Sequence, residues 1–330
     1  MTGVTGPDFE ALQVRDLEAS GRFDLIPSGP YSLSASARFL EGFAPAHYEG
    51  VGPEGLRFAF IADGLDLQER VAGALVKPGA EKVVVETYGE AAPEVVRGQV
   101  ERILSLDTDG RGFAAVGGRD PVVGRLQERY PGLRPVLFYS PYEAAAWTII
   151  GNRIRIVQAA RIKARMAEEL GSPVKVHGKQ ELAFPGPSRL LDLDGFPGLF
   201  GRKAEYLRAV ARAAAEGKLE ASYLRSLPAD EALAKLKELP GIGDFSAELV
   251  LLRGVGVPDR LPTHEPRLDR AVAMAYGLKE PPTAEELFEI SEGWRPYRTW
   301  VGLYLRTMLE DETGEIGGGP KSSRSGAASA

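Results

Sequence analysis

The sequence predicts an α+β protein in which a strand-containing N-terminal part precedes a long all-helical region. The segments LRFAFIAD (56–63) and EKVVVETYG (81–89) are rich in β-forming residues and alternate between apolar and polar positions. From about residue 131 onward, apolar residues instead recur at helical spacing. The chain has 330 residues, which is enough for two or three compact domains with cores of their own.

The pattern divides the chain into four segments. Residues 1–30 are predicted to form a loosely attached arm, and residues 31–130 an α+β domain that includes a helix at 93–106. Residues 131–313 are predicted to be all α. The tail 314–330 is rich in Gly and Ser and is predicted to be disordered.

The helical region carries its own start and stop signals. Ser140 before Pro141, with Glu143 three residues on, is a capping box with proline at the first helical position, and it begins a long apolar-periodic segment, 140–171. Gly171 is suited to end that segment. Further helices are predicted at 198–219, 229–239, 245–256, 265–278, 283–294 and 296–312.

Composition narrows the classes of site that the chain can hold. The sequence has no cysteine, which excludes disulfides, thiolate zinc sites, iron–sulfur clusters and cysteine nucleophiles. It has only three histidines, so we predict no metal site. The acidic N-terminus has no apolar signal-peptide core and no run of about 18 apolar residues occurs, so the expected location is cytoplasmic.

The net charge of −6 hides an uneven distribution. Segment 151–165 (GNRIRIVQAARIKAR) contains no acidic residue, and we predict that it forms a basic face. On charge alone, a solvated helix face is the better interpretation. The basic residues of the segment are Arg153, Arg155, Arg161, Lys163 and Arg165.

The motif LPGIG (239–243) lies between two predicted helices. Two glycines two residues apart permit a tight turn and a close backbone approach to a ligand, and Pro240 ends the preceding helix. The amides of residues 241–247 then lie at the open N-terminus of the next helix, where the helix dipole favours an anion such as a DNA phosphate. The alternative is an ordinary glycine-containing turn between packed helices.

The stretch LPGIGDFSAELVLLRGVGVPDRLPTHEPRLDRAVAMAYGL (239–278) resembles the helix-hairpin-helix DNA glycosylases, nearest the DNA-3-methyladenine glycosylase II type. The resemblance extends over about residues 138–312. It implies two helical subdomains around a cleft, and it relates residues 31–125 to the small antiparallel-sheet domain of that subfamily. It also implies a cofactor-free protein, apart from a structural monovalent cation at the hairpin.

The resemblance places a catalytic carboxylate at Glu265, where the family has aspartate. Cleavage of an N-glycosidic bond builds positive charge on the deoxyribose, which a nearby anion stabilises, and the same carboxylate can orient a water. The alternative is a helix N-terminal glutamate favoured by the dipole. His264 is a candidate to assist the chemistry, and a structural histidine is an equal alternative.

Lyase-active members of the family carry a lysine just after the hairpin, and that position is Phe245 here. We therefore expect a monofunctional enzyme. Several aromatic residues are candidates for a wall of the base pocket, because an aromatic ring attracts a cationic alkylated base. For each of them a place in the core is the alternative. The candidates for this wall are Phe245, Trp147, Tyr142, Trp300 and Tyr304; a further position, aromatic in some relatives, holds Arg306.

A flipped base leaves a gap in the duplex that a side chain must fill. The family's inserting loop corresponds to Asn152-Arg153-Ile154, with Arg153 at the wedge position. The residues predicted to contact DNA are Asn152, Arg153, Ile154, Arg155, Gly241, Ile242, Gly243, Asp244, Ser246 and Ala247.

The sequence therefore predicts a monomeric, nucleoid-associated DNA glycosylase that flips a damaged, alkylated base from double-stranded DNA and hydrolyses its N-glycosidic bond. No membrane partner is expected. A catalytically weak or inactive damage-binding protein of the same fold is the alternative, and the glutamate at position 265 is its best support.

Overall fold

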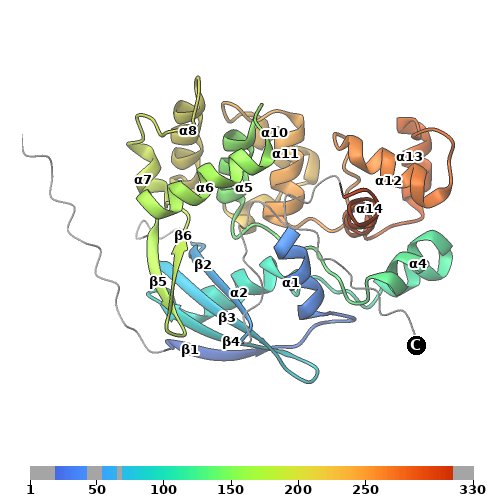
Figure 1. The fold of residues 1–330 in the computed structure, drawn as a ribbon, viewed down its shortest axis with the longest axis horizontal. Coiled ribbons are helices and arrows are strands. Elements are labelled where there is room, and N and C mark those ends of the chain that lie inside the picture. Colours follow the sequence, from blue (N-terminus) through green and yellow to red (C-terminus); the bar gives the residue numbers. More distant parts are fainter. Residues whose placement is uncertain (1–18, 43–53, 65–68, 315–330) are drawn as a thin grey trace, which may run out of the picture.

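A computed structural model describes residues 19–42, 54–64 and 69–314 of the chain (Figure 1). Most of the predicted arm, residues 1–18, and the predicted disordered tail, residues 315–330, lie outside the described residues.

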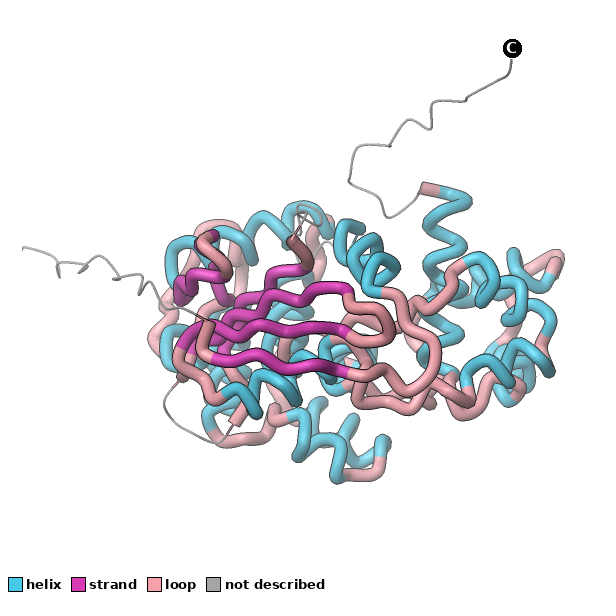
Figure 2. Tube along the Cα trace, turned by 90° about the horizontal axis from the view of Figure 1, so that it is seen from below, coloured by secondary structure: helices cyan, strands magenta, loops and turns pink. Residues whose placement is uncertain are grey.

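The N-terminal part is an antiparallel sheet of four strands in the order β1-β4-β3-β2, which confirms the predicted α+β class. Figure 2 shows these strands side by side. Their bounds are β1 (Gly21–Leu25), β2 (Leu56–Ile61), β3 (Val71–Pro78) and β4 (Val83–Gly89). Strand β1 lies within the predicted arm, so that prediction is wrong for these residues. Phe23 and Leu25 are buried, and β1 pairs with β4 along its whole length.

One face of the sheet packs against α1 (Leu33–Gly42) and α2 (Pro93–Ile103). Phe58 and Phe60 of β2 point to this face, whereas Ala59 between them belongs to a separate cluster on the other face, as the two-residue period of a strand requires.

A hairpin from much later in the chain covers the second face. It consists of β5 (Ser172–Val176) and β6 (Lys179–Ala183), and Val174 and Val176 pack there with Leu75. A Cβ at Gly73 would lie 2.5 Å from the Val176 side chain, so glycine permits this approach. The prediction of an all-α region over 131–313 is therefore wrong at the hairpin.

The rest of the described chain is helical. The helices are α3 (Phe113–Arg119), α4 (Pro121–Arg129), α5 (Pro141–Gly151), α6 (Ile156–Leu170), α7 (Pro187–Leu191), α8 (Lys203–Ala215), α9 (Ala221–Ser226), α10 (Ala229–Lys237), α11 (Asp244–Leu249), the π-helical turn η2 (Val250–Val255), α12 (Pro266–Tyr276), α13 (Ala284–Glu292) and α14 (Arg298–Thr313). Within the part of the chain that the structure describes, none of these helices is long and apolar enough to cross a bilayer.

The predicted segment 140–171 is two helices, α5 and α6, with a break between them. Ser140 caps α5, because its side chain accepts the amide N–H of Glu143 at 3.1 Å, and Pro141 is the first helical residue. Gly171 ends α6 in an extended conformation.

The helices enclose two apolar cores. The buried apolar residues within 138–255, from α5 to η2, form the first helical cluster. The buried apolar residues within 113–133 and 261–309 form the second helical cluster. Helices α3 and α4 were predicted to belong with the sheet. They instead bury Val116, Val123 and Leu126 in the second helical cluster with α14, so the boundary predicted near residue 130 is wrong for them.

Candidate functional site

The glycine hairpin joins α10 to α11, and its two glycines have different roles. Gly241 has φ of +87°, and a Cβ there would lie 2.5 Å from the Tyr206 ring. Gly243 precedes α11 in an ordinary conformation, φ −98°, and a Cβ there would meet nothing within 4 Å. Gly241 is therefore required by the turn, whereas Gly243 leaves open space in front of the helix N-terminus.

The amides available to a ligand are fewer than predicted. Ile242 is 6% exposed and donates its amide to Leu239, while Ala247 is fully buried and donates its amide to Gly243 at 2.8 Å. The predicted DNA contacts at Ile242 and Ala247 are thus wrong, because both residues anchor the hairpin. Among the described residues, no backbone carbonyl accepts the amides of residues 244–246 in the first helical turn, although the amide of Asp244 lies close to its own carboxylate.

Glu265 is the N-cap residue of α12, and its side chain is 15% exposed. Its Oε2 lies 3.4 Å from a guanidinium nitrogen of Arg306 on α14. The Nε of Arg306 is buried and has no hydrogen-bond partner among the described residues. Burial, and then the charge of Glu265, raise the pKa of Asp269 one helical turn further on. The site therefore combines two neighbouring carboxyl groups with the partly exposed guanidinium of Arg306.

The residue that sequence reasoning missed is Glu248 on α11, which is 5% exposed. Its carboxylate accepts the amide N–H groups of Thr263 and His264, the two residues before Glu265, and the hydroxyl of Thr263. The signal in the sequence was a single acidic residue in the otherwise apolar run Ala247–Leu252.

His264 is turned toward this buried carboxylate. Its Nδ1 lies 3.2 Å from Oε1 of Glu248 and 3.1 Å from the hydroxyl of Thr263. The polar contacts of His264 are therefore with Glu248 and Thr263. The pKa of Asp244 is lowered mainly by Lys237 and to a smaller extent by His264. The loop that carries His264 therefore lies next to the hairpin.

Glu265 lies where the two helical clusters meet. Glu248, which accepts hydrogen bonds from the loop before Glu265, lies in the α11–η2 segment, which packs in the first helical cluster. Leu261 and Leu268, on either side of Glu265, are buried in the second. A Cβ added to Gly302 on α14 would lie within 4 Å of the side chains of Pro262 and Leu268.

Four of the five predicted pocket aromatics are core residues. Trp147 and Tyr142 are buried in the first helical cluster, where the Tyr142 hydroxyl donates to the Pro185 carbonyl at 2.8 Å. Phe245, at the start of α11, is the exception, with 48% of its surface exposed.

Trp300 and Tyr304 pack edge-on against Phe113, with ring centroids 5.3 and 5.2 Å apart. Two residues along a helix are about 200° apart, so this stripe of α14 points away from the stripe of Gly302 and Arg306 that faces Glu265. The prediction that these two aromatic residues line the pocket is wrong, because helical spacing does not reveal which stripe meets the site.

The loop that the sequence predicts to insert into DNA is the break between α5 and α6. Asn152 and Arg153 are exposed, and Arg153 has φ of +55°. Ile154 is partly buried and packs against the first helical cluster. Lys203 donates to the carbonyl of Ile150 at 2.8 Å and so holds the last turn of α5. Ile154 thus anchors the loop while Arg153 stands at its tip.

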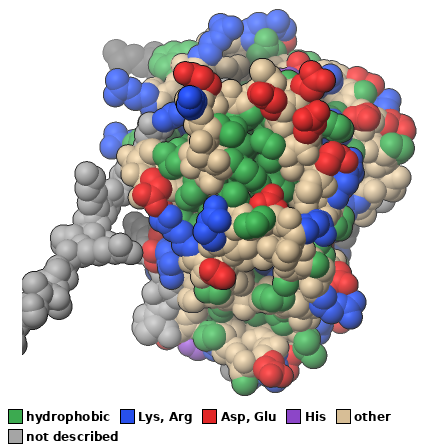
Figure 3. Space-filling view, turned by 90° about the vertical axis from the view of Figure 1, so that its right-hand side faces the viewer, with side chains coloured by type: hydrophobic (Ala, Val, Ile, Leu, Met, Phe, Trp, Pro, Cys, Tyr) green, Lys and Arg blue, Asp and Glu red, His purple; other side chains and the backbone are tan. Residues whose placement is uncertain are grey.

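The predicted basic face is smaller than the sequence suggested. Lys163 is 14% exposed and lies 3.3 Å from the buried carboxylate of Glu143, and Arg165 pairs with Glu169 at 2.7 Å. Among the described residues, Arg153, Arg155 and Arg161 are exposed without an acidic partner. On the side of α12–α14, Figure 3 shows acidic and basic side chains around a hydrophobic area rather than a continuous basic surface.

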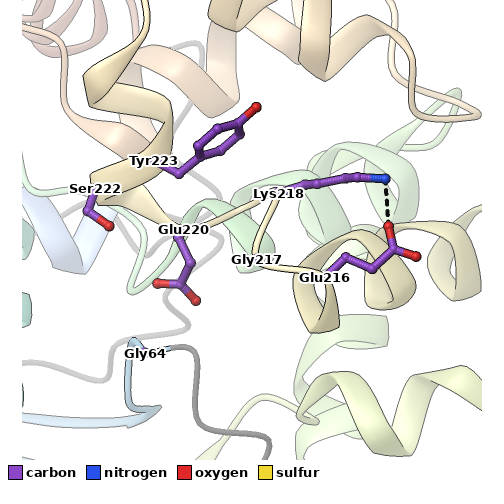
Figure 4. Close-up of a pocket in the computed structure, with 7 residues that line it drawn as sticks. All are labelled: Gly64, Glu216, Gly217, Lys218, Glu220, Ser222 and Tyr223. Atoms are coloured by element: carbon purple, nitrogen blue, oxygen red, sulfur yellow. Dashed lines mark ion pairs between the residues drawn. The ribbon is translucent and has the colours of Figure 1, made fainter.

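Two open cavities lie elsewhere. The larger, of about 650 Å³, is lined by Gly64, Glu216, Gly217, Lys218, Glu220, Ser222 and Tyr223, with Lys218 paired to Glu216 at 2.6 Å (Figure 4). A second, of about 500 Å³, lies beside Arg225 and Gly256. Neither contains a predicted site residue, so neither is the candidate base pocket.

Similar proteins are known, although no protein-family profile matches the chain. The chain is 26% identical over 244 residues to a DNA-3-methyladenine glycosylase of Bacillus subtilis, covering 69% of this chain and 79% of that one. It is 29% identical over 195 residues to DNA-3-methyladenine glycosylase 2 of Escherichia coli, covering 56% and 63% of the two chains.

Solved structures agree on the fold. A 3-methyladenine DNA glycosylase from Archaeoglobus fulgidus superposes with a TM-score of 0.71 at 24% identity, covering 89% of this chain and all of that one. An 8-oxoguanine glycosylase/lyase of Clostridium acetobutylicum in complex with double-stranded DNA gives 0.58 at 18% identity, covering 76% and 88%. The chain is therefore similar in sequence to DNA-3-methyladenine glycosylases, and it shares the fold of solved DNA glycosylases.

Proposed function

We propose that this protein is a monofunctional DNA glycosylase that removes an alkylated base from double-stranded DNA in base excision repair. The observation that carries the proposal is Glu265: a half-buried carboxylate at the N-terminus of α12, next to the glycine hairpin, in a chain with the glycosylase fold. The names of the relatives support the activity and the class of base.

In this proposal Glu265 stabilises the positive charge that develops on the deoxyribose as the glycosidic bond breaks. The same carboxylate orients the water that attacks the sugar. Glutamate reaches about one methylene further than the family's aspartate. The contact with Arg306 supports a fixed position for this longer side chain.

DNA would be held at two places. The amides of residues 244–246 would bind a backbone phosphate at the mouth of the hairpin. Arg153, at the tip of the α5–α6 loop, would enter the space that the flipped nucleotide leaves. Phe245 is the exposed aromatic residue next to the hairpin and would pack against the flipped base. We propose that the protein acts as a monomer.

The absence of lyase activity is part of the proposal, because Phe245 occupies the position of the lyase lysine and offers no amine for a Schiff base. No cofactor is required. A structural monovalent cation would fit the hairpin only through backbone carbonyl oxygens, since the acidic side chain there, Asp244, is paired with Lys237 at 3.0 Å. Similarity to named glycosylases does not support the alternative of an inactive damage-binding protein.

The test is an excision assay on duplexes that each carry one defined lesion, with alkali-labile sites scored after incubation. We expect cleavage at alkylated purines only after alkali, and no covalent trapping by borohydride. Glu265→Gln should bind the same duplexes and excise nothing, whereas Glu265→Asp should retain activity. Full activity of the glutamine variant, or no excision of any lesion by the wild type, would contradict the proposal.

A further inference from the structure

We propose that Glu248 is a positioning residue that holds the catalytic Glu265 in place and connects it to the phosphate-binding hairpin. This inference rests on the proposed function of Glu265. It is carried by a separate observation, the set of hydrogen bonds that ends on one buried carboxylate.

Glu248 is 5% exposed, and three hydrogen-bond donors and one imidazole nitrogen lie close to its carboxylate. The amide of Thr263 lies 3.2 and 3.1 Å from its two oxygens, and the amide of His264 lies 3.0 Å from Oε2. The Thr263 hydroxyl donates to Oε1, and Nδ1 of His264 is 3.2 Å from the same oxygen. A buried carboxylate needs such donors, and two of these are consecutive backbone amides that no change of rotamer can withdraw.

These amides directly precede Glu265. On the other side, the carbonyl of Glu265 accepts the amide of Leu268 at 2.8 Å, and its side chain reaches Arg306. The backbone at Glu265 is thus fixed by Glu248 before it and by α12 after it. If the bonds to Glu248 were weakened, the first of these restraints would be lost while α12 stayed intact.

Glu248 also belongs to the helix that begins at the hairpin. Gly243 caps α11, and Glu248 lies five residues later on the same short helix. A phosphate bound at the free amides of α11 would therefore be held by the helix that also holds the loop of Glu265. One rigid element sets the distance between bound DNA and the catalytic carboxylate, which is what accurate placement of a reacting group requires.

A purely structural role for Glu248 predicts a different result. In that case its replacement would lower stability, and binding and excision would fall together with the folded fraction. A positioning role predicts that the rate of the chemical step falls while the affinity for DNA stays the same.

The experiment compares Glu248→Gln with the wild type in single-turnover excision, duplex binding and thermal unfolding. Glutamine keeps one acceptor oxygen but turns an NH₂ group toward the donors of the loop. We expect the excision rate to fall roughly 10- to 100-fold, the loss associated with a displacement of about 1 Å, with unchanged Kd. Thr263→Val, which removes only the hydroxyl donor, should cause a smaller loss of rate.

The matched control is Glu143→Gln, because Glu143 is an equally buried glutamate, and its ion-pair partner among the described residues is Lys163. It should excise at the wild-type rate when folded. Hydrogen exchange adds a readout independent of activity: the amides of Thr263 and His264 should exchange faster in Glu248→Gln and at the wild-type rate in Glu143→Gln.

Three results would overturn the proposal. They are a wild-type excision rate in Glu248→Gln, a loss of rate matched by an equal loss of affinity or of folded protein, and an equal loss of rate in Glu143→Gln. A wild type that excises no base overturns the proposed function as well, and so is distinguished from a failure of the role of Glu248 alone.

Discussion

The guanidinium of Arg306 lies 3.4 Å from the carboxylate of Glu265 and joins the middle of α14 to the N-cap residue of α12. A cation therefore stands beside the anion that is proposed to stabilise the developing charge on the sugar. The two side chains partly cancel each other's field, so the charge of the base that enters the site should matter.

Arg306→Met should change selectivity in favour of positively charged bases. At an effective dielectric constant of about 20, two cations roughly 8 Å apart repel by about 2 kcal/mol, so the selectivity should change by at least about tenfold. The measurement is the ratio of single-turnover excision rates for 7-methylguanine, which is cationic in DNA, and hypoxanthine, which is neutral. Arg306→Lys keeps the charge and should keep the wild-type ratio; an unchanged ratio in Arg306→Met would contradict this account.

Arg153→Gly should separate the wedge function from the strain at this position. Arg153 has φ of +55°, which costs a non-glycine residue about 1 kcal/mol and glycine almost nothing. The variant should therefore be at least as stable as the wild type. Since unstacking a base costs a few kcal/mol, we expect it to excise from duplex DNA about 10- to 100-fold more slowly.

Excision from single-stranded DNA should change little in this variant, because there is no gap to fill. Arg161→Ala removes an exposed charge on the neighbouring helix and serves as the control. Equal losses on single- and double-stranded substrates, or equal losses in Arg161→Ala, would show that Arg153 acts only through its charge.

The two hairpin glycines should respond oppositely to alanine. Gly243→Ala meets open space in an ordinary conformation, so its free energy of unfolding should stay near the wild-type value while affinity for duplex DNA falls alike for all sequences. Gly241→Ala meets the Tyr206 ring at a φ of +87° and should lose about 1–3 kcal/mol of stability. Urea unfolding and duplex binding at fixed salt distinguish the two variants. A loss of stability in Gly243→Ala would contradict the prediction, because it would mean that the new Cβ contacts protein instead of solvent.

The buried pair of Glu143 and Lys163 predicts a pH dependence of stability. Burial raises the pKa of the Glu143 carboxyl, against the opposing effect of Lys163. The folded protein therefore binds this proton more tightly than the unfolded chain does. The stability that this bound proton contributes is fully present below pH 4.5, the ordinary pKa of glutamate. It is lost as the pH rises through the raised pKa of Glu143 in the folded protein.

Glu143→Gln has no proton to lose and lacks this contribution. The stability of the wild type minus that of the variant should thus decrease from pH 4.5 upward, with a slope of at most about 1.4 kcal/mol per pH unit. Urea unfolding of both proteins at half-unit steps of pH measures the difference. A difference that is flat or rises with pH would mean that Lys163 outweighs the burial of the carboxyl.

The sequence predicted those features that depend on local signals. The cap at Ser140, the strands around Phe58 and Val85, and the glycine hairpin all follow from residues close together in the chain. The resemblance to the glycosylases pointed to Glu265, and the structure places this residue at the N-cap of a helix, as expected.

Features that depend on distant partners were not predictable in the same way. Lys163 stands in a run of basic residues, and only the position of Glu143 on the facing helix shows that its charge is buried. Trp300 and Tyr304 repeat at the same helical spacing as Gly302 and Arg306, so sequence could not tell which stripe faces the core. Strand β3 contains the weak β-formers Ala72, Gly73 and Ala74, and its partners on both sides compensate for them.

The β5–β6 hairpin ties the order of folding to the order of synthesis. Its residues Val174, Val176 and Ala183 close the second face of the four-stranded sheet, whose last strand ends at residue 89. During synthesis on the ribosome, that apolar face stays uncovered until about 90 further residues have been made. At roughly 5–20 residues per second this takes several seconds or more. During that interval a nascent chain displays Leu75 and Tyr88 to solvent, and a chaperone that masks exposed strands would act at this stage of synthesis.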